Sequence, residues 1–429
     1  MLLIVTDDQR WDTLTYMPVV QAELVGKGVT FANSFTVNPL CCPARASILT
    51  GTYPHTHNVW ANNGPWSAPR RLDVERHLGT WLQYAGYRTG LFGKFFNNWG
   101  HPLRPPGFDR WFSFHGPGAA SPYFDYAVDD EGELRWYGTA EADYSTDVVA
   151  REAEAFVREP GPWFAYVAPF APHLPTIPAP RHTSAAFGST EGYPLQYLQT
   201  LLGVDDLVAR LVATLRETGQ LADTVILFTS DNGFHLGEQG LAGKETPYEP
   251  SIRVPLVIRY DAFGAAARAE PALVGNVDLA PTILELAGVS VQHPFEGGSL
   301  APFLRGETVP WRESLQIEFR ARPGGLPSFC QVRGPDWSYV QYQDGREGYW
   351  DLARDPGQNA NLVDAVGRER LVSLRSTVQD SRCRPPGFDP REPCDGGCQL
   401  ERRAPAIAVR PQVERQMHVV GGVVGLIAR

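Results

Sequence analysis

Short apolar segments alternate with amphipathic ones over the first two-thirds of the chain. Residues 2–6, 163–167 and 224–229 are runs of apolar and β-branched side chains, which predict buried strands. Between Val204 and Arg216 the apolar residues follow the i, i+3, i+4, i+7 spacing that places them on one face of a helix. This alternation predicts an α/β fold, in which helices flank a large mixed, mostly parallel sheet.

The pattern changes near Trp311. From there, short segments rich in β-forming residues are separated by Gly, Pro and Asp. They predict a small antiparallel sheet, followed by a helix near residues 363–378. We therefore divide the chain into a main α/β domain (1–310), a subdomain with the antiparallel sheet and the helix (311–381), and an arginine- and proline-rich tail (382–429) that we expect to be extended.

Composition and charge exclude several classes of protein. The 429 residues are 43% hydrophobic with a formal net charge of -10, which argues against general disorder and against nucleic acid as a partner. An anionic ligand would therefore need a local cluster of cations. No run approaches the roughly 20 apolar residues of a membrane span, and the chain opens on a predicted strand instead of a signal peptide. As written, the sequence predicts a cytoplasmic protein, whereas a start that omits an export signal would favour a secreted or periplasmic one.

The six cysteines fall into separate groups. Two are adjacent at 41–42, Cys330 stands apart, and three lie near the C-terminus at Cys383, Cys394 and Cys398. The spacing of Cys394 and Cys398 would suit a metal pair, but no second pair follows at the spacing of a zinc site. We expect a disulfide among the late cysteines, typical of an oxidising compartment, and leave the pairing of Cys330, Cys383, Cys394 and Cys398 open.

Polar residues follow two of the predicted strands at the point where each ends. Asp7 and Asp8 follow the first strand, and Asp231 and Asn232 follow the strand 224–229. Ligands of open α/β sheets bind beyond the carboxyl ends of the strands, and oxygen donors suit a hard cation such as calcium or magnesium. Either pair alone is ordinary turn chemistry, whereas two pairs at corresponding strand ends favour a metal site.

The most informative segment runs from Pro39 to Gly51 (PLCCPARASILTG). Pro43 suits the first turn of a helix and Gly51 its end, which places Cys41 just before the helix N-terminus. The free N–H groups and the dipole there favour an anion, so we expect a lowered pKa for the Cys41 thiol, with Arg45 close enough to bind the same anion. From these properties alone, a pair of buried structural cysteines is an equal alternative.

This segment resembles the signature of the type I sulfatases, Cys-x-Pro-x-Arg followed by a hydrophobic pair and Thr-Gly. Residues 86–94 are similar to the family's second signature and residues 349–362 to its C-terminal motif, in the expected order. The segment 53–59 is most similar to the N-acetylglucosamine-6-sulfatase and arylsulfatase branch. The resemblance implies an alkaline-phosphatase-like fold and a formylglycine made from Cys41 by a formylglycine-generating enzyme. The hydrate of this aldehyde then attacks the sulfur of the ester.

The resemblance also implies a metal site and a set of groups that bind sulfate. The metal, usually calcium with magnesium as an alternative, is held by modified Cys41 and by the four residues at the strand ends: Asp7, Asp8, Asp231 and Asn232. Arg45 holds the formylglycine and a sulfate oxygen. Lys94 and Lys244 clamp the sulfate, and His173 lies near the leaving oxygen.

One position departs from the family pattern. Many members carry a histidine two residues after the lysine of the second signature, where this chain has Phe96. The glucosamine-6-sulfatase branch has an asparagine one residue later, which Asn97 matches. We take Asn97, His57 and His235 as candidate substrate contacts.

The expected function is a sulfuric ester hydrolase that cleaves O-sulfate esters of a sulfated carbohydrate or an aryl sulfate. The loops 60–70 and 100–137, with their aromatic residues and glycines, are expected to select the substrate. Two alternatives stay open. One is a phosphonate or phosphodiester hydrolase of the same superfamily, because similar oxyanions fit the same site; the other is a non-catalytic binding protein that is never matured.

Overall fold

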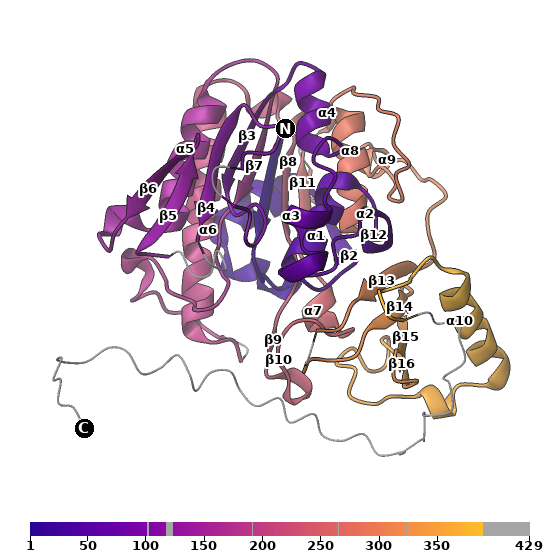
Figure 1. Ribbon diagram of the computed structural model, residues 1–429. Coiled ribbons are helices and arrows are strands. Elements are labelled where there is room, and N and C mark those ends of the chain that lie inside the picture. The colour runs from indigo at the N-terminus through magenta and orange to yellow at the C-terminus, as the bar shows by residue number, and fades with distance from the viewer. Residues whose placement is uncertain (101–102, 117–122, 191, 265, 323, 389–429) are drawn as a thin grey trace, which may run out of the picture.

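A sheet of ten strands forms the centre of the protein, with the order β12-β2-β11-β8-β1-β7-β3-β4-β5-β6 (Figure 1). The computed structural model describes residues 1–388 except 101–102, 117–122, 191, 265 and 323. The strands of this sheet are β1 (Leu2–Thr6), β2 (Val29–Phe35), β3 (Arg88–Gly93), β4 (Arg110–His115), β5 (Tyr126–Asp130), β6 (Glu133–Tyr137), β7 (Trp163–Ala168), β8 (Ile226–Ser230), β11 (Leu256–Arg259) and β12 (Arg268–Gly275).

Pairing is parallel from β8 through β1, β7 and β3 to β4, and also between β12 and β2. It is antiparallel on both sides of β11 and at the edge formed by β5 and β6. The predicted large mixed, mostly parallel sheet is thus confirmed. A separate two-stranded ribbon joins β9 (His235–Leu236) to β10 (Ala242–Gly243).

Helices cover both faces of the sheet (Figure 1). They are α1 (Cys41–Thr50), α2 (Pro54–His57), α3 (Ala68–Arg71), α4 (Leu78–Tyr84), α5 (Ser145–Arg158), α6 (Leu195–Glu217), α7 (Glu249–Ile252), α8 (Leu279–Leu286) and α9 (Ala301–Leu304). Because side chains alternate along a strand, Leu2 and Ile4 of β1 join the core with α5 and α6, whereas Leu3 and Val5 join the core with α1, α4 and α8. Burying each of these side chains stabilises the fold by roughly 1.5–3 kcal/mol.

Residues 100–137 were expected to form a loop, and the structure shows this expectation to be wrong. The segment contains β4, β5 and β6, which extend the main sheet to its far edge. Trp111, Phe112 and Phe114 of β4 are buried, so these aromatic residues pack in the core. Turn-forming residues separate these short strands, and for this reason the sequence pattern did not predict them.

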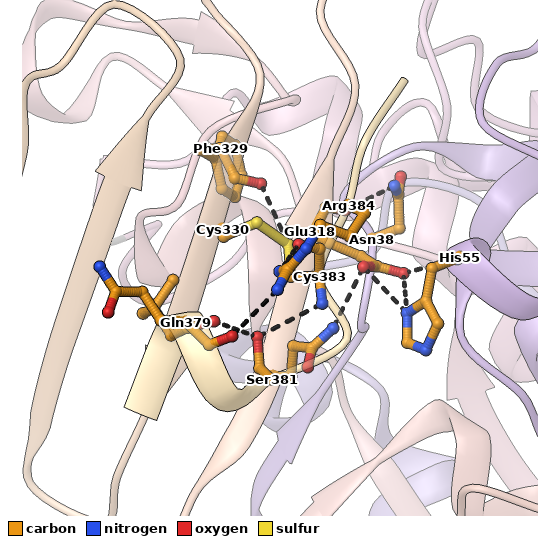
Figure 2. Close-up of a disulfide and its surroundings, with 11 residues drawn as sticks. Asn38, His55, Glu318, Phe329, Cys330, Gln379, Ser381, Cys383 and Arg384 are labelled. Carbon is orange, nitrogen blue, oxygen red and sulfur yellow. Dashed lines mark hydrogen bonds and ion pairs between the residues drawn. A yellow bond between two sulfur atoms is a disulfide. The ribbon is translucent and has the colours of Figure 1, made fainter. Parts of the chain in front are cut away.

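The predicted C-terminal sheet is a four-stranded antiparallel meander covered by α10 (Arg368–Asp380). Its strands are β13 (Leu315–Phe319), β14 (Phe329–Arg333), β15 (Trp337–Tyr342) and β16 (Glu347–Asp351). A disulfide joins Cys330 on β14 to Cys383 just beyond α10 (Figure 2), with the two Cα atoms 5.9 Å apart. The disulfide therefore does not lie within the late group of cysteines, because α10 carries the chain back over β14 and places Cys383 beside Cys330.

Two further expectations can be compared only with the residues that the structure describes. Cys394, Cys398 and most of the predicted extended tail lie outside the described residues. Over the part of the chain that the structure describes, no helix has the length and apolar character needed to cross a membrane.

Candidate active site

The two predicted acidic pairs meet at the carboxyl edge of the sheet. β1 and β8 are neighbouring parallel strands with Thr6 opposite Ser230, so the chain leaves both strands at the same level. The backbone N–H of Asp8 donates to the Asp231 carboxylate over 3.3 Å, and the Asn232 side-chain amide donates to the Asp8 carboxylate over 2.6 Å. Asp8 itself has a φ of 65°, a left-handed conformation that aspartate adopts more readily than most residues. The two turns therefore place three buried carboxylates in one cluster.

Cys41 enters this cluster from the first turn of α1. The helix begins at Cys41 itself, one residue earlier than expected, and ends at Gly51, whose φ of 67° stops it. The Cys41 sulfur lies 3.7 Å from a carboxylate oxygen of Asp7. The next N–H, that of Cys42, donates to the side-chain oxygen of Asn62 over 2.9 Å. Asn62 thus holds the start of the helix in place.

The expected lowered pKa of the Cys41 thiol is wrong for the unmodified side chain. Complete burial raises the pKa of Cys41 to about 11, because a thiolate would lose its solvation and would lie beside Asp7 and Asp231. Lys244 and Lys94 oppose this shift only in part. The helix N-terminus alone does not make this thiol a nucleophile at neutral pH.

Arg45 lies one turn further along α1 and joins three segments of the site. Its Nε donates to the Asp231 carboxylate over 2.8 Å, and Nη1 donates to the backbone oxygen of Lys94 over 2.8 Å. Its Nη2 lies 3.7 Å from an oxygen of Asp7. Although burial disfavours the charge, the neighbouring carboxylates raise the pKa of Arg45 further above its usual value. The planar guanidinium therefore acts as a fixed, fully charged bridge between the strand ends and α1.

Two lysines complete the cluster. The Lys94 amine contacts Asp7, and the Lys244 amine contacts both Asp8 and the Cys41 sulfur. Burial disfavours both charges, but the nearby carboxylates outweigh it and raise both lysine pKa values. Burial by itself would raise the pKa of Asp7. Four neighbouring side chains outweigh burial and hold this pKa well below its usual range: Lys94, His173, Arg45 and Lys244.

The position of Lys94 depends on the glycine before it. Gly93 has a φ of 102°, and a Cβ atom there would lie 2.2 Å from the backbone oxygen of Ala168 on the neighbouring strand β7. No larger residue fits without moving the strand. Gly93 therefore lets β3 turn sharply at its end, and the Lys94 side chain enters the cluster from there.

His173 lies at the rim of the carboxylate cluster. Its Nε2 is 3.6 Å from a carboxylate oxygen of Asp8, and its Nδ1 is 2.6 Å from the backbone oxygen of Leu174. Because a carbonyl oxygen only accepts, Nδ1 carries a hydrogen and Nε2 faces the site. The hydroxyl of Tyr123 donates to the His173 backbone oxygen and helps to hold the loop.

The donor set fits a hard divalent cation. Oxygens of Asp7 and Asp231 lie within 4.8 Å of one another and of the Cys41 sulfur, and Asp7, Asp8 and His173 form a second such group. Among the described atoms, one buried oxygen of Asp8 and the side-chain oxygen of Asn232 accept no hydrogen bond. Buried polar atoms without partners are costly, and carboxylate and amide oxygens are the ligands that calcium and magnesium prefer. These residues could hold such an ion.

The three candidate substrate contacts form hydrogen bonds with residues outside the carboxylate cluster. The His57 ring bonds to the Ser47 hydroxyl over 3.0 Å, and the His235 ring bonds to the Thr246 hydroxyl over 2.7 Å. Burial lowers the pKa of His57 to about 3 and that of His235 to about 4, so both rings are neutral. Asn97 lies beside the second cysteine of the doublet, where its backbone N–H donates to the Cys42 sulfur over 3.2 Å.

Two residues that support the site escaped the sequence analysis. One is Asn62, which anchors α1. The other is Tyr197 of α6, whose hydroxyl donates to the backbone oxygen of Asp8 over 2.9 Å. Asn62 falls inside the loop 60–70 that drew attention for its aromatic residues, whereas Tyr197 sits within an ordinary helix and gives no local signal.

Two family models and several known proteins match the sequence of the chain. The model of the Sulfatase family matches residues 1–289, and the model described as N-sulphoglucosamine sulphohydrolase, C-terminal, matches residues 237–382. The chain is 34% identical over 370 residues to the extracellular sulfatase SULF-1 homolog of Drosophila melanogaster, covering 75% of this chain but 33% of that protein. It is 30% identical to the human N-acetylglucosamine-6-sulfatase, covering 91% of this chain and 86% of that protein.

Solved structures share the fold. One is a protein in complex with its substrate, D-glucosamine-2-N,6-O-disulfate. It has a TM-score of 0.78 and 23% identity, and the match covers 88% of this chain and 96% of that one. Another is the phosphonate monoester hydrolase of Agrobacterium radiobacter, with a TM-score of 0.70 and 23% identity over 88% of this chain and 95% of that one.

Proposed function

The chain belongs to the sulfatase family, and we propose that it is a sulfuric ester hydrolase that cleaves O-sulfate esters of a sulfated sugar. The observation that carries this proposal is the convergence of a buried cysteine with three carboxylates and three cations. Cys41 touches Lys244, which touches Asp8, while Arg45 joins Asp231 to the Lys94 backbone. These side chains come from four separate parts of the sequence and meet at the carboxyl edge of the sheet.

The charges of this cluster suit a sulfate ester. The carboxylates of Asp7, Asp8 and Asp231 formally balance Arg45, Lys94 and Lys244. A divalent cation held by Asp7, Asp8, Asp231 and Asn232 would add positive charge beside Cys41 and help a hydroxyl there to ionise. The site as a whole would then favour the negative charge that develops on sulfate oxygens during transfer.

The other groups orient the ester and move a proton. We propose that Lys94 and Lys244 bind the non-bridging sulfate oxygens, because the Lys244 amine contacts the Cys41 sulfur and the Lys94 amine contacts Asp7 beside that sulfur. Arg45 keeps α1 fixed against Asp231, so the attacking group does not shift during the reaction. His173 presents Nε2 at the rim, where in its charged form it can donate a proton to the leaving alcohol.

A thiol does not explain this chemistry, since burial keeps Cys41 protonated at neutral pH. We propose that a formylglycine-generating enzyme oxidises Cys41 to formylglycine. The hydrated aldehyde supplies one hydroxyl to attack sulfur and a second to expel sulfate afterwards.

A sulfated glucosamine is the proposed substrate class. This rests on the human N-acetylglucosamine-6-sulfatase, which the chain matches over most of its length. The Cys330–Cys383 disulfide is typical of proteins that mature in an oxidising compartment, which supports export from the cytoplasm.

The test combines mass spectrometry with an assay. The protein is coexpressed with a formylglycine-generating enzyme, and the tryptic peptide of residues 28–45 is weighed. We expect the aldehyde at Cys41, a thiol at Cys42, and release of sulfate from glucosamine 6-sulfate and from an aryl sulfate. A matured enzyme that prefers aryl phosphonates or phosphodiesters would support the hydrolase with a phosphorus substrate instead. A matured protein that binds calcium but turns over none of these esters would be a binding protein.

A further inference from the structure

The loop that follows β13 in the C-terminal sheet contacts two segments next to the active site. At the first, the Nε of Arg322 lies 2.8 Å from a carboxylate oxygen of Glu245. Glu245 follows Lys244 directly, its backbone N–H donates to the oxygen of Pro39 over 3.2 Å, and its carboxyl interacts with Lys244 and Asp8. Arg322 is thus paired with the residue that directly follows Lys244, whose amine contacts the Cys41 sulfur.

At the second point, Arg320 lies against the loop that anchors the cysteine helix. The centre of its guanidinium is 5.5 Å from the ring of Trp66, and that of Arg71 is 4.4 Å from the same ring. Trp66 lies in the same loop as Asn62, which holds the N–H of Cys42. Arg320 therefore contacts the loop that anchors the cysteine helix, and Arg322, two residues further along, pairs with the neighbour of Lys244.

The two arginines retain capacity to bind an anion. The buried Nε of Arg320 has no hydrogen-bond partner among the described residues. The Arg322 side chain is 65% exposed, so it lies at the rim and not in the core. A guanidinium fork matches the planar geometry of a carboxylate or the face of a sulfate. The chain has a formal net charge of -10, so a loop with two arginines that contact segments next to Cys41 and Lys244 is a local exception.

We propose that Arg320 and Arg322 form a subsite for a second oxyanion on the substrate, next to the sulfate that is removed. The preferred substrate is then an oligosaccharide that carries a carboxylate or a further sulfate beside the ester, and not a small aryl sulfate. This inference rests on the proposed function and deepens it. It also gives the C-terminal sheet a direct part in substrate choice.

The test compares substrates that differ only in the second anion. The mature, calcium-loaded enzyme is assayed as wild type, as R320A/R322A, and as R354A, whose exposed arginine lies in the turn after β16. The substrates are 4-nitrophenyl sulfate, a disaccharide of a uronic acid and 6-O-sulfated N-acetylglucosamine, the same disaccharide with its carboxyl group reduced, and the reduced disaccharide with an N-sulfate. The last two separate carboxylate recognition from sulfate recognition.

We expect R320A/R322A to lose about 10-fold in kcat/KM on at least one doubly anionic disaccharide, as for the loss of one charged hydrogen bond. The loss should be below about 2-fold on 4-nitrophenyl sulfate and on the reduced N-acetyl disaccharide, and R354A should match wild type throughout. Equal losses on every substrate would mean that Arg322 merely supports Lys244 through Glu245, and would overturn the proposal. An absence of loss on both doubly anionic substrates would overturn it too.

Failure of the proposed function has a different signature, in which mature wild type releases sulfate from none of the four compounds. Binding then tests the subsite without turnover. The uronic acid disaccharide and its reduced, N-sulfated form are titrated by isothermal calorimetry into calcium-loaded C41A and into calcium-loaded C41A/R320A/R322A. We expect the triple variant to bind at least one of the two compounds about 10-fold more weakly than C41A does. Unchanged affinity for both would overturn the subsite.

Discussion

The amine of Lys244 donates a hydrogen bond to the sulfur of Cys41, with Nζ and Sγ 2.9 Å apart, although the two residues are 203 positions apart in the sequence. The same amine pairs with Asp8. Lys244 therefore links the residue that we propose to be modified to the carboxylates that we propose to bind the metal.

Removing the Lys244 charge should impair catalysis more than folding. In Lys244→Ala the sulfate loses a fixed positive partner, and we expect kcat/KM of the mature enzyme to fall about 10²–10³-fold. Steady-state kinetics on an aryl sulfate measure the loss, and a thermal melt checks that the variant is folded. Arg354→Ala serves as a control with an equal loss of charge. A loss below about 3-fold would show that Lys244 does not contact the reacting group.

A divalent cation should stabilise the fold. The three carboxylates of Asp7, Asp8 and Asp231 lie together, and an ion that binds only the folded protein raises its Tm with ion concentration. We expect Tm to rise with calcium, and the rise to shrink in Asp8→Asn. Scanning fluorimetry measures both, with sodium chloride of equal ionic strength as the control. Identical calcium responses in the two proteins would contradict this assignment of Asp8.

The stability of the protein should fall at alkaline pH because of His55. This ring lies 3.1 Å from Glu296 and 3.0 Å from Glu318 (Figure 2 shows the Glu318 contact). Burial disfavours the charged ring, but the two carboxylates outweigh it and raise the pKa of His55 to about 9, above its usual value near 6.5. A raised pKa in the folded state stabilises it below about pH 6.5, and the contribution is lost as the pH rises through about 9. It is on the order of 3 kcal/mol.

Urea unfolding between pH 6 and pH 10 measures this dependence. His55→Gln should be less stable than wild type at pH 6, and the difference should shrink towards pH 10. The pKa values of the two carboxyl groups shift in opposite directions. Burial raises the pKa of Glu318. Burial would also raise the pKa of Glu296, but the hydrogen bond with His55 outweighs burial and lowers it. We therefore expect Glu296→Gln to reduce the pH dependence as well. Parallel curves for wild type and His55→Gln would rule out this role.

Loss of the disulfide should weaken the C-terminal sheet first. Cys330 and Cys383 close a loop with a sequence separation of 53, for which we expect a loss of about 2–4 kcal/mol in Cys330→Ser/Cys383→Ser. α10 packs on β14 through Leu374 and Val378, so limited proteolysis should begin near this helix. Reductant should lower the Tm of wild type but leave that of the double variant unchanged. A double variant as stable as wild type would show that packing alone holds α10.

The sequence by itself determined the central strands of the main sheet, the long helix α6, the C-terminal sheet and the motif residues, because these depend on short-range patterns. Runs of apolar residues marked β1, β7 and β8, and the helical spacing marked the centre of α6, which extends to Leu195–Glu217 because residues such as Leu198 and Leu201 prolong its buried face. Polar pairs after β1 and β8 were readable as one cluster, since the carboxyl ends of neighbouring parallel strands share an edge.

Only the tertiary structure decided how distant residues act on one another. The raised pKa of Cys41 follows from complete burial, which a helix start in the sequence does not reveal. The partner of Cys330 depends on how α10 returns over β14, and the contact of Lys244 with Cys41 depends on how the segment after β10 packs against the start of α1. Such contacts are long-range and are selected by the burial of the whole core, so no local pattern encodes them.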